Sequence, residues 1–143
     1  MENNNKNDKG TAAVEFALIL PLLLFVLFAI IEFSIAMYDK AVITNASREG
    51  ARMGILFGPD PRPDAAAIAA VVSSYTAANL ISFGPSAPST AVTGAPCAPA
   101  PAAPGAYITV SVAYTYNYFV LPNFMASLTG PLVLNGATVM RCE

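Results

Sequence analysis

The chain has 143 residues, of which 55% are hydrophobic and only 11% are charged. Because average soluble domains carry about a quarter charged residues, this composition favours a membrane protein. The net charge of −2 offers no basic surface for nucleic acid. The sequence lacks histidine, the commonest general base and metal ligand, and two cysteines are too few for a four-ligand zinc site. We therefore expect no enzyme, no cofactor, no bound metal and no small-molecule substrate.

The first strong pattern is an apolar run that follows a polar start. The sixteen residues 16–31, between Glu15 and Glu32, carry no charge. As a helix they would span roughly 24 Å, and apolar flanks extend them to the ~30 Å of a bilayer's hydrocarbon core. We predict one membrane-spanning helix, bent at Pro21, which lacks a backbone donor.

A removable signal peptide is the alternative interpretation of this run. Lys6 and Lys9 would form its basic start, and residues 34–36 would supply a small-residue cleavage site. The helical pattern continues through that site, however, and Glu32 would lie just before the cut. We therefore favour a helix that is retained.

The pattern beyond the apolar run is typical of an amphipathic helix. One face carries residues at helical spacing, namely Tyr38, Val42, Ala46, Gly50, Met53 and Phe57. Glu49 and Arg52 are spaced to pair across one turn. Gly58-Pro59 ends the pattern. We therefore predict a single helix from Thr11 to Phe57, about 70 Å long, with its second half outside the lipid.

Small residues recur every four positions in this second half, at Ala46, Gly50 and Gly54. Such a row lets another element approach the helix closely. Two interpretations stay open, because the row can pack on another subunit or on the C-terminal domain of the same chain.

Glu15 is the unusual residue at the other end of the helix. A carboxylate in lipid costs about 2.5–3.5 kcal/mol at mid-membrane and less near the interface, so it usually has a partner. If the chain were cut after Gly10, Thr11 would gain an α-amine that Glu15 of an adjacent subunit could neutralise. The alternative is a carboxylate at the headgroup level with no specific partner.

Residues 58–143 are predicted to form a small domain that begins with a helix. Asp64 is placed to cap a helix over Ala65–Leu80. A proline-rich loop over residues 84–105 follows, because its composition favours extended structure without a packed core.

Alternating side chains predict two strands after this loop, Ala106–Leu121 and an antiparallel return strand over Leu132–Cys142. Asn135-Gly136 could be a hairpin turn, but we favour a glycine within the second strand. Cys97 and Cys142 are the one available pair. A disulfide between them would tie the loop to the last strand and stabilise the domain by about 4 kcal/mol.

Four sequence segments closely resemble one family: residues 10–18 (GTAAVEFAL), 20–23 (LPLL), 31–33 (IEF) and 44–52 (TNASREGAR). The family is that of TadE-like proteins, which are pilin-like proteins of the bacterial tight-adherence (Tad, or Flp) pilus systems. The resemblance covers the first 55 residues, and residues 139–143 resemble the family's C-terminal strand.

The resemblance implies a prepilin-type precursor that a prepilin peptidase cuts after Gly10. Residues 1–10 would be the leader, Thr11 the first mature residue, and Glu15 the pilin glutamate that aids assembly. A chain of 143 residues resembles an accessory or minor pilin (a pseudopilin) more than the much shorter main pilin. Its implied partners are the membrane, the peptidase, other pilin-like subunits and the Tad secretion machinery, and its implied role is surface adhesion.

The expected fold is therefore α+β, with a long membrane-spanning helix (11–57) that continues into a small extracytoplasmic domain (58–143) with a second helix and a small antiparallel sheet. The resemblance places it in the bacterial cytoplasmic membrane as a single-pass protein with the C-terminal domain outside. Basic residues are similar in number on the two sides of the span, so charge alone does not set this orientation. The alternative function is a membrane-anchored binding or scaffolding protein that is neither processed nor polymerised.

Overall fold

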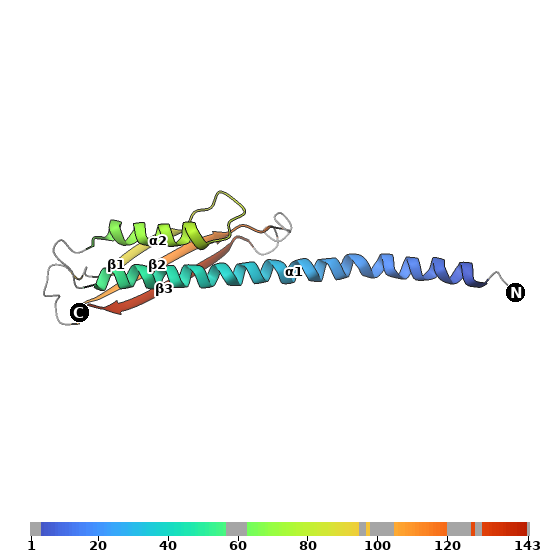
Figure 1. Cartoon of the computed structure of the whole chain (residues 1–143), viewed down its shortest axis with the longest axis horizontal. Helices are drawn as coiled ribbons and strands as arrows, with labels where there is room; N and C mark the ends of the chain where they lie inside the picture. Colours follow the sequence, from blue (N-terminus) through green and yellow to red (C-terminus); the bar gives the residue numbers. More distant parts are fainter. Residues whose placement is uncertain are drawn as a thin grey trace. The chain divides into compact units, whose positions relative to one another are not determined.

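The computed structural model describes residues 4–56, 63–94, 97, 105–119, 127 and 130–142. Their elements are α1 (Asn4–Ile55), α2 (Ala65–Asn79), β1 (Ser89–Gly94), β2 (Tyr107–Tyr116) and β3 (Leu132–Arg141) (Figure 1). The chain divides into two compact units, Met1–Ser34 and Ile35–Glu143. The α+β class with one long apolar N-terminal helix, a second helix and an antiparallel sheet is confirmed.

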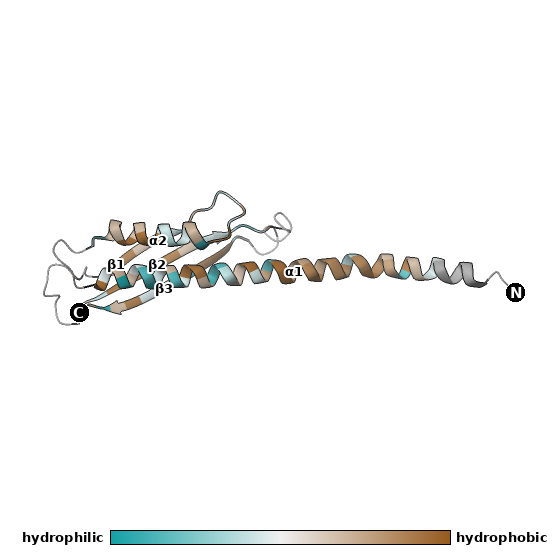
Figure 2. Cartoon of the chain, viewed as in Figure 1, coloured by the Kyte–Doolittle hydropathy of each residue, from teal (hydrophilic) through white to brown (hydrophobic). Residues whose placement is uncertain are grey.

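The first unit consists of the apolar part of α1, which is brown over most of its length in Figure 2. Residues 10–31 are exposed on all sides of the helix, apart from the half-buried Leu20 and Ala29. A helix that is apolar all round needs a lipid or protein environment to cover it. Gly10–Ile55 contains a window apolar enough to cross a membrane, and none of that window is buried within the protein. This helix fits a single-pass membrane protein.

Helix α1 begins earlier than expected, at Asn4, and it continues through Pro21 to Ile55 as one element. Phe57, Gly58 and Pro59, where we expected the helix to end, lie outside the described residues. The compact second unit begins at Ile35, within α1, because the second half of the helix supplies part of its core.

The second unit contains a three-stranded antiparallel sheet in the order β1-β2-β3. The predicted strand Ala106–Leu121 is shorter, since β2 ends at Tyr116. β3 covers almost all of the predicted return strand. Gly136 lies inside β3 opposite Val112, so the hairpin turn at this position is ruled out.

Strand β1 was missed by the sequence pattern, which indicated an irregular loop over residues 84–105. Ser89–Gly94 pairs with β2, with Thr90 opposite Val112 and Val92 opposite Val110. Thr90 and Val92 are half-buried, whereas Ala91 and Thr93 are exposed, as the two-residue period of a strand requires. The loop prediction is therefore wrong for β1, because pairing with β2 satisfies backbone groups that its short, proline-flanked sequence could not satisfy alone.

Helix α2 and the second half of α1 cover one face of the sheet, and no described helix covers the other face (Figure 1). The core lies between them and contains Ile43, Ala46, Ile68, Val72, Ile108, Val110, Val112 and Tyr114.

On α1 the buried row runs through Ala36, Asp39, Ile43, Ala46, Gly50 and Gly54. The predicted row was wrong at Tyr38, which is 46% exposed, because it followed apolar character and passed over the buried Asp39.

Helix α2 begins as predicted with Asp64 as its N-cap, and a carboxylate oxygen of Asp64 accepts a 2.8 Å hydrogen bond from the Ala67 N–H. We expect Asp64→Ala to lower the free energy of unfolding of the second unit by about 1 kcal/mol, because this N–H loses its acceptor. Asp64→Asn keeps an acceptor and is expected to stay close to wild type. Chemical denaturation of the detergent-solubilised protein, followed by circular dichroism, compares the two; equal stability of both variants would contradict this capping role.

Candidate functional site

The predicted cleavage position lies in α1, where Gly10 and Thr11 are both exposed. A Cβ atom added to Gly10 would meet no atom within 4 Å. Glycine inside a helix is about 1 kcal/mol less favourable than alanine. Packing among the described residues therefore does not require a glycine at this position.

Glu15 lies on an exposed apolar surface of the same helix. Its neighbours Val14 and Phe16 are 62% and 63% exposed, and the chain carries no further charge until Glu32. Thr11 and Glu15 are four residues apart and therefore share one face of the helix. This carboxylate would be costly to cover with lipid, so the arrangement favours a partner cation when the helix is embedded.

Two other acidic residues of α1 are buried, Glu32 at 6% and Asp39 at 0% exposure. One Asp39 oxygen accepts a 3.0 Å hydrogen bond from the Ile81 N–H, just after α2, while its other oxygen has no hydrogen-bond partner among the described residues. The sequence analysis missed Asp39. The spacing of Ala36, Asp39 and Ile43 could have indicated that Asp39 is buried, because the three residues follow helical periodicity on one face although the middle one is charged.

The small residues of α1 pack against the same chain. A Cβ atom on Gly50 would lie 2.6 Å from Val72 and 3.3 Å from Val110, and one on Gly54 would lie 2.7 Å from Ile108. Ala46 is completely buried. Of the two interpretations that the sequence left open, packing on the chain's own α2 and β2 is the one that these distances describe.

Cys97 and Cys142 form a disulfide, with their Cα atoms 5.4 Å apart. The N–H of Cys142 also donates a 3.0 Å hydrogen bond to the carbonyl of Ala106, which precedes β2. Cys97 is only 2% exposed. The expected link between the proline-rich segment and the last strand is present.

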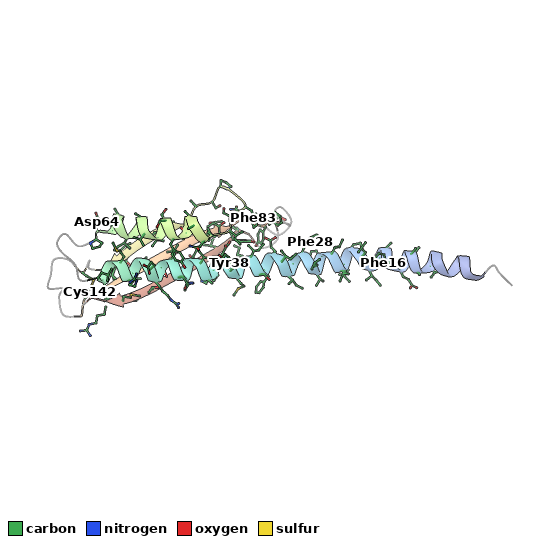
Figure 3. The ribbon with its side chains drawn as sticks, viewed as in Figure 1. Phe16, Phe28, Tyr38, Asp64, Phe83 and Cys142 are labelled. Atoms are coloured by element: carbon green, nitrogen blue, oxygen red, sulfur yellow. A yellow bond between two sulfur atoms is a disulfide. The ribbon has the colours of Figure 1, made fainter. Side chains whose placement is uncertain are left out.

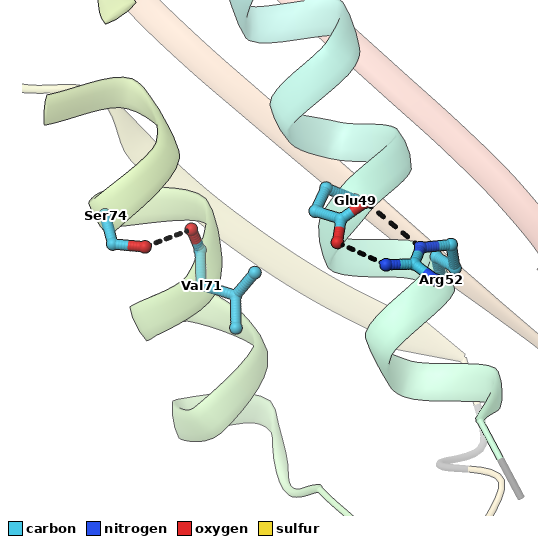
Figure 4. A network of polar contacts seen from close by, with 4 residues as sticks. All are labelled: Glu49, Arg52, Val71 and Ser74. Atoms are coloured by element: carbon cyan, nitrogen blue, oxygen red, sulfur yellow. Dashed lines mark hydrogen bonds and ion pairs between the residues drawn. The ribbon is translucent and has the colours of Figure 1, made fainter. Parts of the chain in front are cut away.

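The exposed pair expected on α1 is also present (Figure 4). Arg52 donates hydrogen bonds of 2.7 and 3.1 Å to the two carboxylate oxygens of Glu49. Their side chains are 60% and 41% exposed, so solvent screening keeps the contribution of the pair to stability small. In the same view, Ser74 donates to the carbonyl of Val71 within α2.

Within the residues that the structure describes, no group of three or more Cys, Asp or Glu side chains is placed to hold a metal ion. A depression of about 340 Å³ on the sheet is lined by small side chains such as Ala91, Ser111 and Ala137. The sequence-predicted residues Gly10, Thr11 and Glu15 lie on the exposed surface of α1.

Comparison with known families supports this emphasis on α1. Residues 10–52 match the family model of TadE-like proteins, a segment that contains Gly10, Glu15, Ala46 and Gly50. No curated protein and no solved structure matches the chain. Residues 10–52, and with them most of α1, are therefore similar to TadE-like proteins, as the sequence resemblance indicated.

Proposed function

We propose that this protein is a minor pilin or pseudopilin of a Tad pilus, a membrane-anchored structural subunit that takes part in pilus assembly for surface adhesion. The observation that carries the proposal is the coincidence of the TadE-like segment with α1. The first half of this helix presents an apolar surface with an exposed carboxylate at Glu15. Its second half forms part of the core of a folded unit.

In this proposal a prepilin peptidase cuts between Gly10 and Thr11 and removes the polar residues 1–10. An exposed glycine with no packing role supports this, since a bulky side chain next to the scissile bond would obstruct a peptidase. The C-terminal unit then lies outside the cytoplasm of the inner membrane, an environment in which a disulfide between Cys97 and Cys142 persists.

Intact-mass measurement of the protein from membranes of cells with an active prepilin peptidase tests the processing step. We expect a mature chain that begins at Thr11, and we expect Gly10→Val to leave the leader attached. The matched control is Ala17→Val, which adds similar bulk at an exposed position of the same helix and should be processed normally.

Two other masses would contradict the proposal. A wild-type chain that still begins at Met1 would exclude a processed pilin and favour the alternative, an unprocessed membrane-anchored scaffolding or binding protein. A chain that begins at Met37 would identify residues 1–36 as a signal peptide.

Glu15 provides a test of assembly that is separate from processing. We expect Glu15→Gln to be cleaved but to be recovered in sheared pili about tenfold less than wild type, a difference of about 1.4 kcal/mol in association. The physical reason is the loss of a carboxylate that would neutralise the Thr11 α-amine of a neighbouring subunit. Glu49→Gln removes an exposed carboxylate outside the apolar segment and is the control. Equal recovery of the two variants would exclude this role of Glu15.

A further inference from the structure

The Ile35–Glu143 unit gathers exposed apolar side chains at one of its ends. We define these residues, Met37, Tyr38, Ile81, Phe83, Phe119 and Leu132, as the proximal rim; their exposure ranges from 37% to 56%. In Figure 3, Tyr38 and Phe83 lie at this end, whereas Asp64 and Cys142 lie at the opposite end.

Contacts within the unit hold the rim together. The hydrogen bond from the Ile81 N–H to Asp39 places the segment after α2 beside the start of this part of α1. The rings of Phe83 and Phe119 lie 4.4 Å apart. Leu132 begins β3 opposite Tyr116, the last residue of β2. A depression of about 320 Å³ opens among these elements, lined by Phe83, Tyr116 and Tyr118.

Charge is excluded from this end of the unit. From Ala65 to Met140 the sequence contains no charged residue. The two charged residues of α1 nearest the rim are Asp39, which is completely buried, and Lys40, whose ammonium group donates to the Asn135 carbonyl. An apolar, aromatic surface without exposed carboxylates suits the boundary between lipid headgroups and acyl chains, where aromatic side chains concentrate.

The position of the rim along the chain indicates that the rim contacts the bilayer. The unit begins at Ile35, and its first residues, which include Met37 and Tyr38, belong to this end. In the sequence they directly follow the apolar run that ends before Ser34. Interfacial side chains reach about 5–10 Å into the headgroup and acyl boundary. We propose that the proximal rim inserts into the headgroup region of the bilayer that α1 spans, so that the folded unit rests on the membrane surface.

This proposal requires α1 to span a membrane but does not require pilus assembly. The chain has no tryptophan, so single tryptophans report on single positions without background. We would place Phe83→Trp in the rim, Tyr107→Trp near the opposite end of the sheet, where the native side chain is 56% exposed, and Phe25→Trp in the apolar helix as the insertion control. Each full-length variant is reconstituted into phosphatidylcholine vesicles with and without bromine near the carbonyl end of the acyl chains.

We expect brominated lipid to reduce the fluorescence of the Phe83→Trp variant by about half or more, because bromine at that depth meets interfacial side chains. The Phe25→Trp variant should also be quenched, and the Tyr107→Trp variant should not. A cooperative denaturation transition like that of the wild type shows that each variant has folded, and Phe119→Trp is the second rim reporter if Phe83→Trp does not fold.

Three results would overturn the proposal. If the tryptophan at position 25 is quenched while the rim reporters behave like the one at position 107, the unit does not touch the bilayer. If rim tryptophans are shielded from acrylamide only at high protein density, and brominated lipid leaves them unquenched, a second copy covers the rim instead. If the tryptophan at position 25 also escapes quenching, α1 is not inserted and the premise fails.

Discussion

Replacing both Cys97 and Cys142 by serine is expected to lower the free energy of unfolding of the Ile35–Glu143 unit by about 4 kcal/mol on the chain-entropy model. The bridge joins residues separated by 45 positions, so its loss gives the unfolded chain many more conformations. Residues 95–105 around Cys97 are rich in proline and alanine and contain no large apolar side chain that could replace the constraint. Chemical denaturation of the solubilised double variant measures the loss.

Two comparisons make this result specific to the bridge. Reduction of the wild-type protein should reproduce the loss measured for the double serine variant. Ser74→Ala changes an exposed residue of α2 whose hydroxyl donates to the Val71 carbonyl, and this variant should stay within about 0.5 kcal/mol of wild type. A double variant that loses less than about 1 kcal/mol would show that the bridge contributes little beyond the core.

Gly136→Val is expected to lower the stability of the same unit by about 3 kcal/mol, at the upper end of typical overpacking costs. A Cβ atom at this position would lie 2.9 Å from the carbonyl oxygen of Ile43 and 3.0 Å from the backbone nitrogen of Thr44. These are backbone atoms of α1, so no side-chain rotation can relieve the contact. The helix and β3 would have to separate.

The matched control is Ala137→Val, the same final side chain one residue further along β3. Ala137 is exposed, on the opposite side of the strand from Gly136, and valine is favoured in strands. We expect this variant to remain within about 0.5 kcal/mol of wild type. Separation of α1 from β3 should also break the 2.7 Å hydrogen bond between Ser47 and Thr138, which hydrogen exchange near Ser47 would detect. Equal stability of the two valine variants would mean that α1 does not pack closely on Gly136.

Local patterns in the sequence were enough to identify several elements. The uncharged run between Glu15 and Glu32 indicated the apolar helix, because its length matches a bilayer. Asp64 and the helical spacing after it indicated α2, because a cap acts on backbone donors only three residues away. The alternation around Val110 indicated β2, since a buried face imposes a two-residue period.

The partners of these elements depended on residues far apart in the chain. Ser89–Gly94 is a strand because it meets β2, and a six-residue segment between prolines carries no sign of that pairing. The row of small residues at Gly50 and Gly54 indicated a close approach, but only the fold shows that α2 and β2 are what approaches. Asp39 gave no signal that the sequence analysis used, and its burial and its bond to the Ile81 N–H follow from the fold.

The sequence by itself therefore determined the long apolar helix, its TadE-like motifs, the cap of α2 and the one cysteine pair. The helix and the cap depend on composition and on interactions between residues close in the sequence. The cysteine pair follows from the number of cysteines, because two cysteines allow one pairing. Tertiary structure alone decided the third strand, the inner face of α1 and the gathering of aromatic side chains from Tyr38 to Phe119 at one end of the folded unit. These three features depend on contacts between groups that are far apart in the sequence. The pattern of a single segment does not show which other segment it will contact.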